Sequence, residues 1–198
     1  MSLRFTYTAL APFYDAMVSR ASARARAASI AALPREGCQR IFLNGIGTGL
    51  DLPLLPAQHN YVAIDLTRAM LDRALPRKGS LNIAWVQGDS QALPFADAVF
   101  DHAVLHLILA VVPDSVRALR ESARVVKPGG SLYILDKFLR PGQSAWLRRA
   151  INPLARRMAT RTDVVFEDVL AQVPGLNVAA DEAAAFGGWF RRIRLARG

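Results

Sequence analysis

The sequence has almost no cysteine: Cys38 is the single one. One cysteine cannot build an internal disulfide framework, which excludes the small disulfide-stapled domains and fits a reducing compartment. Histidine is scarce as well, with three residues, and no group of His, Cys and acidic residues has the spacing of metal ligands. No Ser-His-Asp or Cys-His arrangement stands out either. We therefore expect no metal centre and no hydrolase-type nucleophile.

Long apolar runs are also missing. The longest run, residues 103–113, is too short to span a bilayer and is interrupted by His106. The opening residues, MSLRFTYTAL, lack the charged region and long apolar core of a signal peptide. These features predict a cytoplasmic protein without a transmembrane helix.

Positive charge is abundant and unevenly placed. The 25 Lys and Arg residues outnumber the 16 acidic ones, for a net charge of +9. An acid-free stretch between Lys137 and Asp163 alternates apolar and basic residues at helical spacing, and its arginines are Arg140, Arg148, Arg149, Arg156, Arg157 and Arg161. Such a basic amphipathic helix suits peripheral contact with an anionic membrane, but a solvated face that covers the core explains it equally well. Nucleic acid is a weaker partner, because aromatics are not interleaved as stacking platforms.

The chain is organised around residues 40–55. A short apolar run, residues 41–44, predicts a buried parallel strand, and a turn with Gly45, Gly47 and Gly49 follows it. A helix is expected to begin near residues 50–53, since Pro is tolerated in a first helical turn. Strand, glycine turn and helix together let the backbone approach a ligand closely.

Asp65 ends the next apolar run and lies 20 positions after Gly45. An acid at this distance from a glycine turn can bind ribose hydroxyls, so the pair predicts an adenosine-type ligand on a doubly wound α/β sheet. A dinucleotide oxidoreductase is the first rival. Its G-x-G-x-x-G fingerprint is disfavoured because Leu50 follows Gly49.

The G-x-G-x-G spacing resembles the class I S-adenosylmethionine (SAM) dependent methyltransferases. The resemblance extends, in the family's order, through AIDLTRAML (63–71), GDSQALPFADAVFD (88–101) and LRESARVVKPGGSLYILD (119–136). GTGLDLPLLP and the early YTALAPFYD are most similar to bacterial phosphatidylethanolamine N-methyltransferases and ubiquinone/menaquinone C-methyltransferases. This family resemblance implies an α/β fold: a Rossmann-like seven-stranded, mostly parallel sheet with helices on both faces and an antiparallel last strand.

We expect one domain over residues 1–198. Its parts are an N-terminal cap and helix (1–38), a cofactor-binding core (39–137), the basic insertion (138–163) and a C-terminal helix and hairpin (164–198). The resemblance implies SAM as cofactor, and the residues that it assigns to cofactor binding are Tyr14, Asn44, Gly45, Ile46, Gly47, Gly49, Asp65, Leu66, Met70, Asp89, Ser90 and Leu105. In this resemblance the glycine turn would wrap the methionine part of SAM. Asp65 would bind the ribose, and Asp89 and Ser90 would contact the edge of the adenine.

The sequence allows two interpretations for each of three candidate residues. Tyr14 would contact the cofactor or only pin the N-terminal segment to the core, and Asp89 would be a cofactor ligand or a plain turn acid. His106 is the last residue of the predicted fourth strand, residues 101–106, at the carboxyl edge of the sheet, where ligands bind. It is the candidate general base, with a structural histidine as the alternative.

One position departs from the family pattern. The residue two before the first glycine is normally an acid that holds the cofactor's ammonium group, and here it is Leu43. Asn44 is polar but one residue off. We expect a methyltransferase acting on a small or lipid-like acceptor, with a phospholipid head group or quinone precursor favoured. The alternative is a weakly active or inactive member of the fold that acts through its Arg-rich surface.

Overall fold

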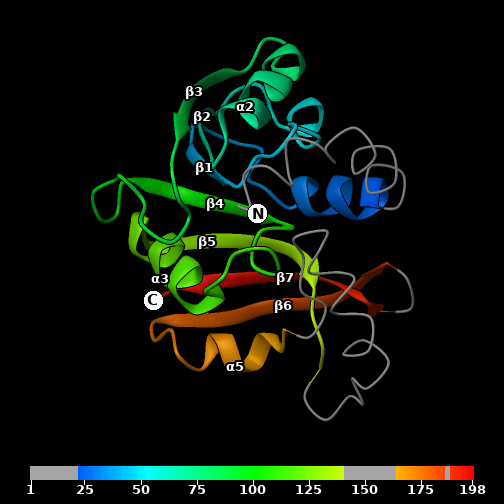
Figure 1. Ribbon diagram of the computed structural model, residues 1–198, viewed down its shortest axis with the longest axis vertical. Helices are drawn as coiled ribbons and strands as arrows, with labels where there is room; N and C mark the ends of the chain where they lie inside the picture. Colours follow the sequence, from blue (N-terminus) through cyan, green and yellow to red (C-terminus); the bar gives the residue numbers. More distant parts are fainter. Residues whose placement is uncertain (1–21, 141–163, 186–187) are drawn as a thin grey trace.

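The computed structural model describes residues 22–140, 164–185 and 188–198. They form a seven-stranded sheet in the order β3-β2-β1-β4-β5-β7-β6 (Figure 1). All pairings from β3 to β5 are parallel, and β7 runs antiparallel to both β5 and β6. The α/β, Rossmann-like fold with an antiparallel last strand is therefore confirmed.

The strands follow the apolar runs of the sequence closely, because strands buried on both faces are nearly continuous in apolar residues. Their bounds are β1 Arg40–Asn44, β2 Asn60–Asp65, β3 Asn82–Gln87, β4 Phe100–His106, β5 Val126–Lys137, β6 Leu176–Ala185 and β7 Phe190–Arg197. Since β1 pairs in parallel with both β2 and β4, the carboxyl ends of these three strands meet at one edge of the sheet.

Helices cover both faces. The first described helix spans residues 22–31, and the others are α2 Arg68–Ala74, α3 Ser115–Val125 and α5 Phe166–Leu170, with the 3-10 helices η1 Leu52–Leu54 and η2 Leu75–Arg77. Two of these helices have N-cap side chains: Thr67 accepts from the Met70 amide at the start of α2, and Asp114 accepts from the Arg117 amide at the start of α3.

The prediction of a helix after the glycine turn was wrong. Residues 52–54 form only a short 3-10 turn. Leu55 is extended (φ −72°, ψ 137°), as the residue before a proline prefers, and Pro56 ends the element before an α-helix can develop. The turn is therefore followed by irregular chain rather than by a helix that aims its N-terminus at a ligand.

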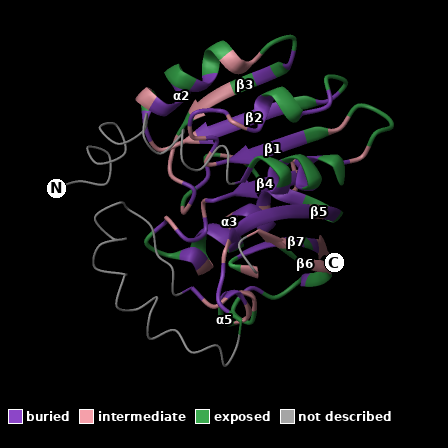
Figure 2. Ribbon diagram, turned by 90° about the vertical axis from the view of Figure 1, so that its right-hand side faces the viewer, coloured by how far each residue is buried: buried purple, intermediate pink, exposed green. Residues whose placement is uncertain are grey.

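The central strands of the sheet are buried along most of their length (Figure 2), and an apolar layer lies on each face of the sheet. On one face, Leu43 packs with Ile30 and Leu33 beside residues of α2 and η1. On the other, Phe42 and Leu105 pack with residues of α3 and α5. The alternation along β1 sends neighbouring side chains to opposite layers.

Some expectations lie outside the described residues: the N-terminal cap with Tyr14, and most of the basic insertion. The division of the chain into four parts stays a prediction. Within the described ranges, no helix has the length and apolar character to cross a bilayer.

We expect Gly49 to tolerate no side chain. Gly49 has φ +79°, and an added Cβ would lie 2.7 Å from Leu52 and 3.0 Å from the backbone of Ala74. Gly129 has the same φ, with no atom within 4 Å of an added Cβ. Gly129→Ala should cost about 1 kcal/mol of unfolding free energy through backbone strain alone, and Gly49→Ala about 3 kcal/mol, because crowding adds to strain. Urea unfolding of both variants measures this, and equal losses would show that the turn can relax.

Candidate active site

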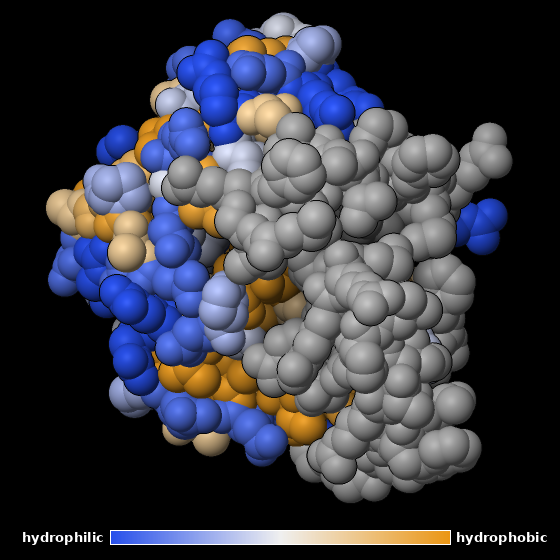
Figure 3. All heavy atoms as spheres, viewed as in Figure 1, coloured by the Kyte–Doolittle hydropathy of each residue, from blue (hydrophilic) through white to orange (hydrophobic). Residues whose placement is uncertain are grey.

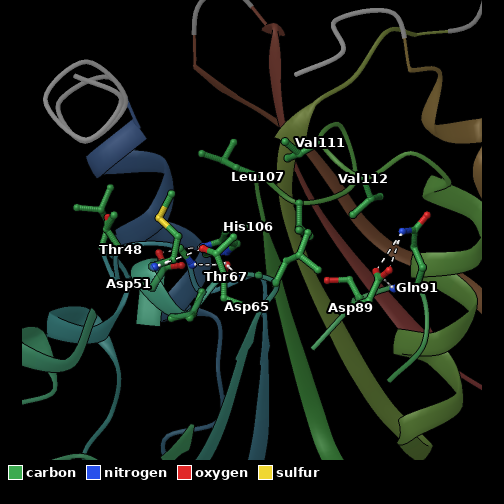
Figure 4. Close-up of a pocket in the computed structure, with 18 of the residues that line it drawn as sticks. Thr48, Asp51, Asp65, Thr67, Asp89, Gln91, His106, Leu107, Val111 and Val112 are labelled. Carbon is green, nitrogen blue, oxygen red and sulfur yellow. Dashed lines mark hydrogen bonds and ion pairs between the residues drawn. The ribbon is translucent and has the colours of Figure 1, made fainter. Parts of the chain in front are cut away.

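A pocket opens at the edge where β1, β2 and β4 end. Its lining comes from the glycine turn, the segments after β2, β3 and β4, and the helix of residues 22–31. Figure 3 shows apolar side chains gathered in a hollow near the middle of one face of the molecule. The close-up in Figure 4 places Asp89 and Gln91 at one side of the pocket, with Asp65 and His106 nearer the middle and Asp51 at the opposite side.

The glycine turn and Asp65 are joined directly. The Gly47 amide donates to Asp65 Oδ2 at 2.9 Å, and the Thr67 amide donates to Asp65 Oδ1 at 3.0 Å. Burial raises the pKa of Asp65, and these hydrogen bonds offset only part of that effect. At Gly47 (φ +56°) an added Cβ would meet no atom within 4 Å, so the turn leaves open space beside the carboxylate.

The far side of the pocket carries Asp89 and Ser90. The Asp89 carboxylate accepts from the Gln91 amide at 2.8 Å and is half-buried. The Ser90 hydroxyl donates to Asn44 Oδ1 at 2.5 Å, and Asn44 Nδ2 donates to Ser122 at 2.9 Å. Asn44 therefore ties β1 to α3 and to the segment after β3, from behind the pocket wall.

The near side holds a buried charged cluster. Asp51 Oδ1 accepts from Arg26 Nη1 at 2.8 Å and from His106 Nδ1 at 3.0 Å. His106 Nε2 lies 2.9 Å from the Ser29 hydroxyl. Burial by itself raises the pKa of Asp51, but His106 and Arg26 outweigh it and hold that pKa well below its ordinary value. Asp51 is thus kept ionised inside the protein.

An apolar wall closes the pocket between the two sides. It is formed by Leu107, Ile108, Val111 and Val112. Leu107 adopts φ +59°, a left-handed conformation that costs a leucine about 1 kcal/mol or more. Its amide donates to the Leu135 carbonyl at 2.8 Å, which anchors the bend directly after β4.

Most of the predicted cofactor residues line this pocket: Gly45, Ile46, Gly47, Asp65, Leu66, Met70, Asp89 and Ser90. Asn44, Gly49 and Leu105 do not line it, and their side chains or backbone belong to the packing behind it. Tyr14 lies outside the described residues. His106 lines the pocket, but both of its ring nitrogens are already hydrogen-bonded.

Two residues of the pocket, Arg26 and Asp51, were not predicted from the sequence. A signal existed for Arg26: Ser22, Arg26 and Ser29 recur at helical spacing, in step with the buried Ala25 and Ile30. This pattern places a polar stripe on the inward face of the helix. Asp51 had no local signal, because nothing in its neighbourhood distinguishes a buried acid from a turn acid.

Comparison with known proteins now decides the family. A model of the methyltransferase domain matches residues 44–134. The chain is 32% identical over 189 residues to a phosphatidylethanolamine N-methyltransferase of Cereibacter sphaeroides, covering 93% of this chain and 92% of the relative. The chain belongs to the SAM-dependent methyltransferases.

Other relatives are consistent with this membership. A demethylmenaquinone methyltransferase of Mycolicibacterium paratuberculosis is 34% identical over 135 residues, covering 64% of this methyltransferase and 56% of the relative. The structure of a SAM-dependent methyltransferase, a possible histamine N-methyltransferase, from Thermotoga maritima superposes with a TM-score of 0.74 at 19% identity, covering 100% of both chains. That likeness supports the fold.

The pocket of this methyltransferase fits SAM. The cofactor carries an adenosine end with hydroxyl donors and an amino acid end with an ammonium and a carboxylate. Carboxylates stand at three places along the pocket, on Asp51, Asp65 and Asp89, with Arg26 beside the first. The open side of Gly47 gives a ligand access to the turn.

Asp51 and Asp65 should respond to pH with opposite signs. The folded-state pKa of Asp51 is lowered, so its ionisation stabilises the fold at neutral pH, and this stabilisation is lost as the pH falls from about 5 toward that folded pKa. Asp51→Asn should therefore be about 2 kcal/mol less stable than wild type at pH 7, with the gap narrowing by pH 3. Urea unfolding at several pH values measures the gap.

Asp65→Asn is the matched control, because the pKa of Asp65 is raised. Its ionisation opposes folding, so this variant should gain stability relative to wild type as the pH rises above about 4. A gap for Asp51→Asn that does not change with pH would contradict the proposed role of the Arg26 and His106 contacts.

Proposed function

We propose that this methyltransferase transfers the methyl group of SAM to the primary amine of a phosphatidylethanolamine-type head group. The observation that carries the proposal is the match to a phosphatidylethanolamine N-methyltransferase, which extends over 93% of this chain. The quinone-type relative is matched over a smaller part of both chains. A demethylated quinone is the second candidate acceptor.

SAM would supply a methyl group on a positively charged sulfur. The neutral amine of the acceptor would take it by in-line displacement, so that the N–C bond forms as the C–S bond breaks and S-adenosylhomocysteine leaves, and the resulting ammonium would then release a proton to water. The protein contributes position and a dry environment. In this proposal Asp65 binds the ribose hydroxyls, and Asp89 with the Ser90 backbone holds the adenine edge. The apolar wall of Leu107, Ile108, Val111 and Val112 keeps water from the reacting atoms.

His106 stays a prediction as the catalytic residue. Its ring is buried, and a proton from the acceptor could reach Nε2 only if the Ser29 contact were given up. We therefore favour a positioning role, in which His106 orients Asp51 and the helix of residues 22–31. Methyl transfer does not require a dedicated base when the acceptor nitrogen is held unprotonated.

The net charge of +9 supports an encounter with a membrane that contains anionic lipids. We propose that the enzyme works at such a surface, in peripheral contact with it. The arginines expected to make that contact lie mainly in residues 141–163, outside the described ranges. The acceptor would then enter the pocket head-group first, from the membrane side.

The acceptor can be identified with labelled SAM and vesicles. We expect label in the lipid fraction with phosphatidylethanolamine vesicles, and none with phosphatidylcholine vesicles, whose head group is already fully methylated. Adding phosphatidylglycerol should raise the rate at low salt and not at high salt. Label only in demethylated menaquinone would favour the quinone acceptor, and label only in free ethanolamine would argue against a lipid substrate.

Asp65 gives a direct test of cofactor binding. Asp65→Ala should weaken the binding of S-adenosylhomocysteine about 100-fold, because a buried carboxylate that accepts ribose hydroxyls is lost. Asp72→Ala is the matched control and should bind as wild type does, because Asp72 lies on the exposed face of α2, where it pairs with Arg68. Calorimetric titration measures both, and unchanged binding by Asp65→Ala would remove Asp65 from the site.

A further inference from the structure

The position that usually carries the ammonium-binding acid cannot do so in this chain. Leu43 is 2% exposed and packs in the apolar layer with Ile30 and Leu33. Its neighbour Asn44 faces the opposite layer, and its side-chain amide is hydrogen-bonded to Ser90 and Ser122. The end of β1 therefore offers no charged side chain to the amino acid part of the cofactor.

A different acid, Asp51, lies on the pocket wall, and one of its carboxylate oxygens accepts no hydrogen bond from the described residues. Both hydrogen bonds to Asp51 end on Oδ1, from Arg26 and His106. Within the described part of the chain, Asp51 Oδ2 accepts no hydrogen bond, although the residue is 6% exposed and lines the pocket. An ionised carboxylate has room for about four hydrogen bonds, two on each oxygen, so half of its capacity faces the pocket unused.

Arg26 is placed in a similar way. Its guanidinium donates from Nε to Ser22 at 2.9 Å and from Nη1 to Asp51 at 2.8 Å. A guanidinium has five N–H donors, and those on Nη2 find no acceptor among the described residues. Arg26 is 7% exposed and also lines the pocket. No fully buried side-chain nitrogen or oxygen among the described residues lacks a hydrogen-bond partner, so the Nη2 donors open onto the pocket, where the acceptor atoms of a ligand can pair with them.

Together the two side chains present a negative and a positive group, 2.8 Å apart, on one wall. An α-amino acid end is the complementary arrangement, with an ammonium and a carboxylate on one carbon. We propose that the Arg26–Asp51 pair binds the amino acid end of SAM, with Asp51 Oδ2 accepting from the ammonium and Arg26 donating to the carboxylate. The pair thus takes over the role that Leu43 leaves empty.

The rest of the cluster keeps this pair in place. His106, at the end of β4, holds Asp51 Oδ1 from one side, and Ser29 holds His106 from the other. Figure 4 shows Asp51 and His106 pointing toward one another at the side of the pocket away from Asp89. An adenine held at Asp89 and a ribose at Asp65 would extend the cofactor toward Asp51.

The test compares two ligands that differ only at this end. S-adenosylhomocysteine carries the amino acid, whereas 5′-methylthioadenosine keeps the adenosine and the sulfur without it. We expect Asp51→Asn and Arg26→Gln to bind S-adenosylhomocysteine about 10-fold to 100-fold more weakly than wild type, as for a lost hydrogen bond between charged groups. Binding of 5′-methylthioadenosine should stay within about twofold of the wild-type value. Calorimetry measures both without requiring activity.

Two variants control for the change in charge. Arg24→Gln removes a charge from the exposed face of the same helix, and Asp72→Asn removes one from the exposed face of α2. Both should bind both ligands as wild type does. Circular dichroism at the titration temperature verifies that each variant is folded.

This inference rests on the SAM-dependent activity and not on the identity of the acceptor. Its failure can therefore be told apart from a failure of the proposed function. Equal loss of both ligands in folded Asp51→Asn and Arg26→Gln would assign the pair a structural role and overturn the inference. Unchanged binding of S-adenosylhomocysteine in both variants would overturn it too, while leaving the methyltransferase function intact. Failure of the wild type to bind either ligand would overturn the cofactor site itself, and with it the proposed function.

Discussion

Parallel pairing of β1 with β2 on one side and β4 on the other is the constraint on which the site depends. Because parallel strands end at the same edge, the chain segments after Asn44, Asp65 and His106 emerge side by side. This arrangement brings the glycine turn, Asp65 and His106 from distant points of the sequence around one pocket. The two apolar layers make this pairing stable, and the loops supply the chemistry.

Buried polar groups hold that edge in one geometry. Asn44, Ser90 and Ser122 form a chain of hydrogen bonds through one layer, and Arg26, Asp51 and His106 form another at the opposite side of the sheet. Removing any member would strand its partner away from water, which costs more than the hydrogen bond itself contributes. These clusters therefore act as geometric restraints on the pocket more than as sources of net stability.

The two clusters also differ in what they leave unused. In the Asn44 chain, Asn44 donates and accepts within the protein, so nothing is offered to a ligand from its side chain. In the Asp51 cluster, one carboxylate oxygen and part of a guanidinium remain without partners among the described residues. A buried network that is complete stabilises structure, and one that is incomplete at a pocket wall is suited to binding.

The sequence by itself determined the sheet, the glycine turn, the helix caps and part of the pocket lining. Each of these rests on local information: apolar runs set β1 to β4, Thr67 caps α2, and Asp65 stands where β2 ends. The resemblance to a methyltransferase family, whose motifs recur in a fixed order, supplied the expected cofactor and the residues expected to bind it. The expected helix after Gly49 was wrong because the effect of Pro56 on Leu55 outweighed the favourable position of Pro53.

Only the tertiary structure decided where Arg26, Asp51 and His106 lie and which residues they contact. Arg26 could have faced solvent, and Asp51 could have been an ordinary turn acid, because neither burial nor partners 25 and 55 positions away in the chain are encoded locally. The same holds for Leu43 and Asn44, whose sides of the sheet follow from register. Burial and long-range pairing are properties of the assembled layers, and they convert a scattered set of polar residues into one charged wall of the cofactor pocket.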